Sequence, residues 1–139
     1  MEWMLMPYKR YFDFSGRSRR KEYWMFVLLM VIVYIVLGGL MFVTGMTVNE
    51  MTGEPEMGGA GMLFGGLLGI FVLASFIPAL AVQVRRFHDQ DKSGWFVLLS
   101  LIPYVGGLIV LVFMCLEGTK GPNRFGADPK DPSSSEVFA

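Results

Sequence analysis

The stretch YWMFVLLMVIVYIVLGGLMFVTGMTVN, residues 23–49, contains no Asp, Glu, Lys, Arg or His. Two further tracts, 57–84 and 93–116, share this property. Crossing the hydrocarbon core of a bilayer takes about 20 predominantly apolar residues, so each tract is long enough to cross. A chain of 139 residues is normally one domain. The sequence therefore predicts an all-α, polytopic membrane protein with apolar segments at about 24–43, 62–84 and 95–116.

The charged residues are distributed unevenly, although the 12 basic and 12 acidic residues cancel. Residues 1–22 carry six bases against three acids, and the loop 85–93 adds three more bases. The loop 44–60 carries three glutamates and no base. Because bases are enriched in cytoplasmic loops, we expect a multi-pass protein with its N-terminus and loop 85–93 in the cytoplasm and loop 44–60 outside. The bases adjoin a membrane segment, so they favour anionic lipid headgroups over nucleic acid as a partner.

The N-terminal block is expected to begin with a short helix lying in the headgroup region. Tyr8, Tyr11 and Phe12 recur at the spacing of one helical face, with bases on the other faces. Further along, Arg19–Lys21 would occupy the first turn of the first spanning helix, where cations oppose the helix dipole by roughly 0.3–1 kcal/mol each. The anionic inner leaflet is the simplest compensation, and Glu22 is a local counter-charge.

The second apolar segment contains glycines every fourth residue, at Gly61, Gly65 and Gly69. On a helix this spacing makes a groove in which another backbone approaches closely. The pattern predicts a helix-packing face, and its partner is the first segment, the third segment or another copy of the chain. Pro78 predicts a kink because it lacks a backbone donor.

The third apolar segment is interrupted by Pro103-Tyr104-Val105-Gly106-Gly107, which predicts a kink or a break. A single kinked span, the preferred interpretation, leaves the C-terminus outside. A re-entrant helical hairpin returns the C-terminus to the cytoplasm, which suits the bases at Lys120, Arg124 and Lys130. Residues 1–120 are expected to form one membrane domain, followed by a flexible tail at 121–139 that is rich in Pro, Gly and Ser.

Few residue patterns point to chemistry. The segment RRFHDQDKSGW (85–95) holds the only histidine, His88, beside Asp89 and near Asp91. A zinc site needs three or four ligands in compatible geometry, and this segment does not supply them. Ser93 lies in no nucleophile motif, and the single cysteine, Cys115, excludes an intramolecular disulfide. We expect no enzyme activity, no catalytic residue, no metal and no cofactor.

Three segments stand out together: DFSGRSRRKEYWMF (13–26), RRFHDQDKSGW (85–95) and GPNRFG (121–126). In this order around the apolar tracts they resemble the YhaH/YhaI family of small bacterial inner-membrane proteins, grouped as domain of unknown function 805. The resemblance implies a multi-span helical inner-membrane protein and no agreed activity. Asp91, where relatives often have Gly, and Phe96, in place of a common Trp, depart from the family pattern. The matching residues are Gly16, Arg17, Arg19, Arg20, Glu22, Tyr23, Trp24, Arg85, Arg86, His88, Asp89, Ser93, Gly94, Trp95, Gly121, Asn123, Arg124 and Gly126.

The two basic motifs border spans on the same expected side of the membrane. We therefore expect a lipid-facing or interfacial network in which Glu22 and Asp89 pair with Arg85 or Arg86 and with Arg17 or Arg19. The expected function is a non-enzymatic scaffold or modulator of a membrane partner, with self-association as a further possibility for the glycine face. A component of a small oligomeric transporter or channel is the alternative. The expected network comprises Arg17, Arg19, Arg20, Glu22, Trp24, Arg85, Arg86, His88, Asp89 and Trp95.

Overall fold

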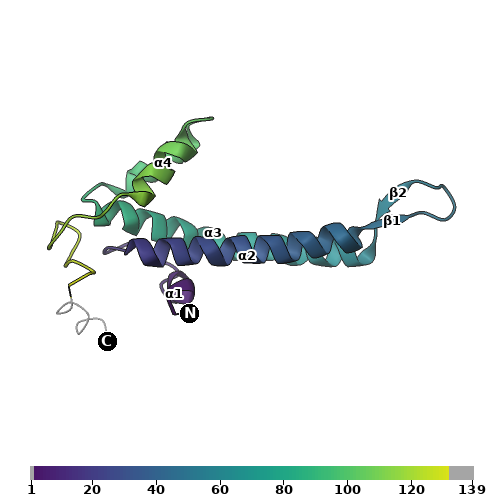
Figure 1. Cartoon of the computed structure of the whole chain (residues 1–139), viewed down its shortest axis with the longest axis horizontal. Helices are drawn as coiled ribbons and strands as arrows, with labels where there is room; N and C mark the ends of the chain where they lie inside the picture. Colours follow the sequence, from purple (N-terminus) through teal and green to yellow (C-terminus); the bar gives the residue numbers. More distant parts are fainter. Residues whose placement is uncertain (1, 132–139) are drawn as a thin grey trace. The chain divides into compact units, whose positions relative to one another are not determined.

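The computed structural model describes residues 2–131, and its regular elements are mostly helical (Figure 1). The prediction of a helical protein is confirmed. Helices α2 and α3 are each long and apolar enough to cross a membrane, whereas the third apolar segment forms two shorter helices. The elements are α1 (Glu2–Lys9), α2 (Arg20–Gly45), β1 (Met46–Val48), β2 (Pro55–Met57), α3 (Gly59–Asp89), the 3-10 helix η1 (Gly94–Leu101) and α4 (Gly106–Cys115).

The chain divides into two compact units. One, here called the apolar unit, comprises residues 27–76. The other, here called the polar unit, comprises 2–26 and 77–131 of the described chain. Residues 132–139 of the expected flexible tail lie outside the described residues.

The apolar unit is a pair of helical segments, from α2 and α3, joined by the antiparallel β1–β2 hairpin (Figure 1). The strands pair Met46 with Met57 and Val48 with Pro55. Gly61 lies so close to the backbone of Gly45 that a Cβ on Gly61 would collide with it. Close backbone approach through small residues is the usual way in which membrane helices pack.

The three glycines of the predicted packing face have different surroundings. Gly61 faces Gly45 of α2, and a Cβ on Gly65 would lie 3.4 Å from the Met41 sulfur of the same helix. A Cβ on Gly69 would meet no described atom within 4 Å. The first two glycines therefore face α2 within the chain, and the third borders open space.

Large apolar side chains cover the outside of the apolar unit. Phe42 and Leu73 are 77% and 76% exposed, and Ile35 and Val43 are also exposed. A helix that is apolar all round belongs in a protein core or in a membrane, and these side chains are not covered by protein in the structure.

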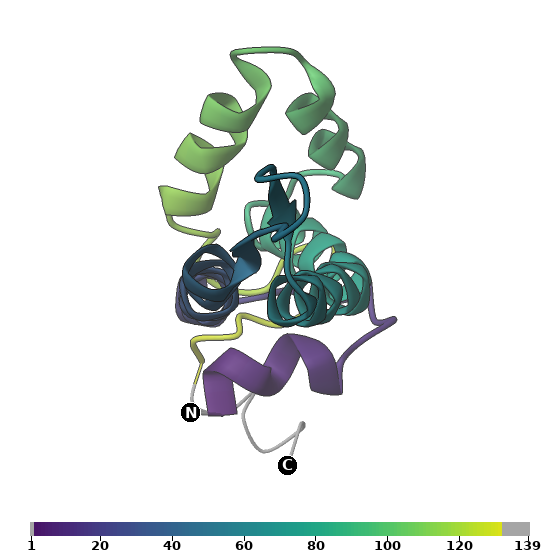
Figure 2. The ribbon, with the colours of Figure 1, turned by 90° about the vertical axis from the view of Figure 1, so that its right-hand side faces the viewer.

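The third apolar segment forms a helical hairpin, seen in Figure 2 as the two green arms of η1 and α4. The ring centroids of Phe96 and Phe113 lie 6.2 Å apart across it. The segment folds back on itself instead of continuing as one kinked helix, because both ends of the hairpin contact the end of α3. The amide of Lys92 donates to the carbonyl of Phe87 (2.9 Å), and the amide of Thr119 donates to that of Asp89 (2.8 Å).

The turn of the hairpin explains why the chain reverses at this point. The Pro103 ring fixes φ and removes a donor, and Tyr104 has a positive φ of 66°. Gly106 then approaches the carbonyl of Leu99 so closely that a Cβ would collide with its oxygen. Val97 and Leu99 of η1 pack against the buried cluster of Phe87, Val110 and Met114.

Candidate functional site

Two consecutive arginines at the end of α3 organise the polar unit. Arg85 is fully buried, and its Nη2 lies 2.8 Å from Oε1 of Glu22. Its Nη1 donates to the carbonyl of Asp13 at 2.5 Å. The Ser18 hydroxyl donates to the second Glu22 oxygen at 2.6 Å. Both oxygens of the Glu22 carboxylate are therefore occupied by donors.

Asp89 forms the second centre of the network. Its Oδ1 accepts from Nε of Arg17 at 3.0 Å, and its Oδ2 accepts from Nη1 of Arg86. Arg86 and Asp89 are three residues apart, a spacing that places both on one helical face. Arg17 also donates to the carbonyls of Gly121 (2.6 Å) and Thr119 (2.5 Å). One buried carboxylate thus joins α3 to the segment before α2, and the same Arg17 reaches the chain after α4.

The third motif, GPNRFG, contacts the other two. Nδ2 of Asn123 donates to the carbonyl of His88 at 2.9 Å. The His88 ring stacks on Phe125 with centroids 4.0 Å apart, and its Nδ1 lies 3.1 Å from the carbonyl of Gly16. Residues of the expected tail that the structure describes are therefore hydrogen-bonded into the polar unit.

Asp128, in the same segment, accepts backbone hydrogen bonds from Lys130 (2.9 Å) and Gly121 (2.8 Å). The hydrogen bond from the Lys130 amide has the largest effect on the pKa of this carboxyl, and it lowers that pKa. Burial opposes it, and the Gly121 amide adds to it, so the pKa of Asp128 lies below its ordinary value.

The structure gathers some of the expected network residues and separates others. Arg17, Glu22, Arg85, Arg86 and Asp89 lie together and are covered by protein rather than exposed to lipid. His88 adjoins this cluster, and Trp24 packs against the apolar cluster that contains Phe87. Arg19 donates to the carbonyl of Pro129 instead of pairing with Asp89, and Arg20 donates to that of Cys115 at 2.8 Å. Trp95 is 77% exposed.

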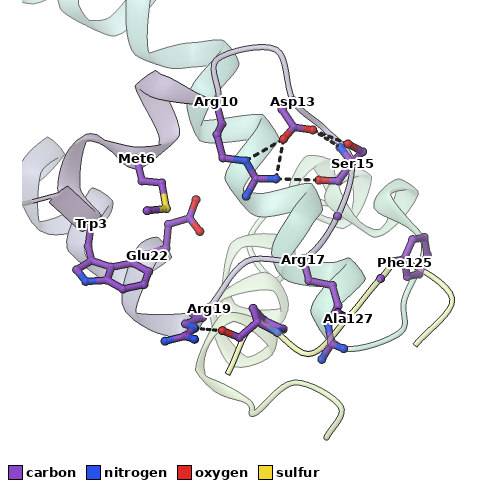
Figure 3. Close-up of a pocket in the computed structure, with 13 residues that line it drawn as sticks. Trp3, Met6, Arg10, Asp13, Ser15, Arg17, Arg19, Glu22, Phe125 and Ala127 are labelled. Atoms are coloured by element: carbon purple, nitrogen blue, oxygen red, sulfur yellow. Dashed lines mark hydrogen bonds and ion pairs between the residues drawn. The ribbon is translucent and has the colours of Figure 1, made fainter. Parts of the chain in front are cut away.

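A cavity of about 400 Å³ adjoins the network (Figure 3). Trp3 and Met6 of α1 line one side, and the Glu22 carboxylate points into the space beside them. Arg10 binds Asp13 on the rim at 2.6 Å. Burial would raise the pKa of Asp13, but hydrogen bonds from Ser15 and from Arg10 outweigh it, so this pKa lies below its ordinary value.

The arrangement limits the chemistry that this site offers. Glu22 and Asp89 each have arginine partners at hydrogen-bond distance, and both carboxylates are buried. Within residues 2–131, no three His, Cys, Asp or Glu side chains lie together as metal ligands would. Buried charge pairs of this kind hold segments of a chain together. Removing one partner strongly destabilises the folded protein.

The fold and the network define a small helical protein with two helices of membrane-spanning length. A family model described as protein of unknown function (DUF805) matches residues 11–127, and the chain belongs to this family. It is 49% identical to the inner membrane protein YhaH of Escherichia coli (strain K12), over 94% of this chain and 98% of YhaH. It is 43% identical to the inner membrane protein YhaI of the same strain, over 94% and 97%.

A more distant relative is the uncharacterized protein YiiR of Escherichia coli (strain K12), which is 24% identical over 86% of this chain and 88% of YiiR. No solved structure matches the chain. The resemblance inferred from the three motifs is confirmed by the family match. All three motifs lie within the matched residues 11–127.

Proposed function

We propose that the chain is a non-enzymatic integral protein of the bacterial inner membrane that scaffolds or modulates a membrane partner. The observation that carries this proposal is the contrast between its paired charges and its open surface. The buried carboxylates are bound by arginines of the same chain, whereas the outward faces of α2 and α3 are apolar. The names of the relatives YhaH and YhaI support the inner-membrane location.

Charge distribution supports a topology for the two long helices. The bases before α2 and after α3 favour the cytoplasmic side, and the base-free β1–β2 loop with Glu50, Glu54 and Glu56 favours the outside. In this topology α2 and α3 cross the bilayer in opposite directions, and the charge network lies at the cytoplasmic surface.

Neither arm of the η1–α4 hairpin is long enough to cross the bilayer. Ten α-helical residues rise about 15 Å, and eight residues of 3-10 helix rise about 16 Å, which is half of a hydrocarbon core of about 30 Å. Both ends of the hairpin contact the end of α3. Residues 117–131, with Lys120, Arg124 and Lys130, would therefore lie in the cytoplasm as the positive-inside rule favours.

Reporter fusions test this topology. A fluorescent protein that folds only in the cytoplasm is fused after Ala139, and an alkaline phosphatase, active only outside, is fused there in a second version. The re-entrant hairpin predicts fluorescence and no phosphatase activity. The same pair of reporters inserted after Thr52 should give the reverse result. Phosphatase activity after Ala139 would instead support a single spanning segment.

The open glycine face provides a test of the scaffold. Gly69→Leu adds bulk where no described atom lies within 4 Å, so it should leave the chain's own packing intact. Gly39→Leu, at an equally open position on α2, is the matched control. We expect the tagged wild type, cross-linked in native membranes, to co-purify one membrane protein in constant ratio. Gly69→Leu should abolish this co-purification and Gly39→Leu should retain it.

Two outcomes would contradict the scaffold. Equal loss with both variants would exclude Gly69 as part of a specific contact. Absence of any partner, combined with solute or ion flux through liposomes containing the purified chain, would support the alternative of an oligomeric transporter or channel.

A further inference from the structure

A second hollow in the polar unit is distinct from the cavity beside Glu22. It has a volume of about 580 Å³ and lies between the start of α2 and the end of α4. Four basic side chains and one indole account for five of its six lining residues, which are Arg19, Arg20, Lys21, Trp24, Cys115 and Lys130. We call it the basic hollow.

Negative charge around the basic hollow is sparse. Glu117 pairs with two of these bases, and one of its oxygens lies 3.8 Å from Nη2 of Arg20 and 3.4 Å from Nζ of Lys130. The Asp128 carboxylate also attracts Lys130. Lys21 has no acidic partner in the described part of the chain, and its Nζ lies 5.4 Å from the centre of the Trp3 ring. The four bases therefore outnumber the acids, Glu117 and Asp128, whose charges act on them.

The nearest buried acid does not supply the missing charge. Glu22 follows directly after Lys21, but its oxygens are occupied by Arg85 and Ser18. Arg20 and Lys130 are half exposed, with side chains 43% and 50% accessible, so an incoming anion reaches them without displacing the core.

Helix geometry adds to the attraction for an anion. α2 begins at Arg20, so three of the four bases lie at its positive end, where cations are unfavourable and anions are favourable. A phosphate in the basic hollow would meet both these bases and the positive end of the helix dipole. It would thereby offset an arrangement that is otherwise electrostatically unfavourable.

We propose that the basic hollow binds the phosphodiester headgroup of an anionic phospholipid. The Trp24 indole and the last turn of the apolar helix α4 border the bases, so a ligand with a phosphate head and apolar chains suits both parts of the lining. Basic pockets beside membrane helices at the cytoplasmic surface bind such headgroups. This inference rests on the proposed membrane placement.

The test measures lipid binding to the full chain, purified in nonionic detergent, by native mass spectrometry with added phosphatidylglycerol or phosphatidylcholine. The site variant carries Arg20→Gln, Lys21→Gln and Lys130→Gln. The matched control carries Lys9→Gln, Lys92→Gln and Arg124→Gln, which removes the same residue types from the polar unit outside the basic hollow. Since one base near an anionic surface contributes roughly fivefold to binding, the site variant should bind phosphatidylglycerol more than about tenfold more weakly. The control should bind nearly as the wild type does.

Several results would overturn the proposal. Equal weakening in both variants would mean diffuse attraction by surface charge, and equal binding of phosphatidylcholine would exclude charge recognition. Binding of free glycerol phosphate as tightly as phosphatidylglycerol would assign the site to a soluble phosphate ester. Membrane fractionation of the wild type and of the site variant distinguishes failure of the lipid site from failure of the proposed membrane placement. Normal insertion with normal lipid binding overturns the basic hollow alone, whereas a wild type that is recovered in the soluble fraction overturns the membrane placement.

Discussion

Different interactions stabilise the interior of the polar unit and the interior of the apolar unit. In the polar unit the central contacts join distant parts of the sequence, Arg17 with Asp89 and Arg85 with Glu22. In the apolar unit, residues 27–76 contain three glutamates and no base, so an ion pair within it is impossible. There the helices approach through Gly45 and Gly61. The same chain thus uses charge pairing where polar groups are buried and small residues where helices are apolar.

This difference has an energetic basis. Apolar helices in lipid gain little from burying more apolar surface, so close packing decides their association. A buried charge is stable only while its partner is present, and removing the partner leaves an uncompensated charge. The two units should therefore respond to different substitutions.

The largest effect is expected for Asp89→Ala in the polar unit. This change leaves Arg17 and Arg86 buried without their shared carboxylate, which should cost about 3–5 kcal/mol of unfolding free energy. Thermal unfolding in detergent measures it. Glu117→Ala, which removes one exposed acid, should leave the melting temperature nearly unchanged, because exposed ion pairs contribute little to stability. If the two variants unfold at the same temperature, the buried network does not stabilise the polar unit.

A smaller loss is expected for Gly61→Leu in the apolar unit. The added side chain collides with the Gly45 backbone, and overpacking of this kind costs about 1–3 kcal/mol. Gly66→Leu, where no described atom lies within 4 Å of the Cβ position, is the matched control and should unfold as the wild type does. An unchanged melting temperature for Gly61→Leu would exclude the close contact between α2 and α3.

The hairpin of the polar unit should show an effect of about 1 kcal/mol. Gly106→Ala places a methyl group against the Leu99 carbonyl and should open the turn between η1 and α4. Gly107→Ala introduces the same methyl group beside it, where the described atoms leave space. Protease sensitivity of the segment 99–106 measures the difference. Equal cleavage of both variants would argue against the tight turn.

The smallest effect concerns pH and Asp128. Because the pKa of this carboxyl is lowered in the folded chain, its contribution is present above the unfolded pKa and is lost as pH falls through the folded pKa. Asp128→Asn should therefore lower the melting temperature slightly at pH 7. The gap to the wild type should close toward pH 3. A gap that stays constant with pH would mean that the carboxylate charge does not contribute.

Much of the fold could be predicted because membrane segments have a strong sequence signal. The charge-free tracts located α2 and α3, and the spacing of the motifs indicated the family. The two basic motifs were expected on the same side of the membrane, which suggested that Glu22 and Arg85 would meet. In the structure Nη2 of Arg85 lies 2.8 Å from Oε1 of Glu22. These inferences depend on composition and order along the chain, which the sequence contains directly.

The remaining features depend on contacts between distant residues. The hairpin and the single span have the same apolar length, and only the close approach of Gly106 to Leu99 and the bond from Thr119 to Asp89 distinguish them. Arg17 binds Asp89 and Arg19 does not, and both lie before α2 begins, where helical periodicity gives no facing direction. Thr119 and Gly121 contribute carbonyls to Arg17, and residue type does not reveal such a role.

The pairing of Glu22 with Arg85 joins the start of α2 to the end of α3. A double-mutant cycle tests it most directly, with Glu22→Arg, Arg85→Glu and the double variant compared with the wild type by thermal unfolding in detergent. Each single variant places like charges together and should be strongly destabilised, whereas the double variant restores an opposite pair. If Glu22 and Arg85 pair, the double variant should recover about 0.5–3 kcal/mol beyond the sum of the single effects. A double variant no more stable than the single variants would show that the two residues do not pair.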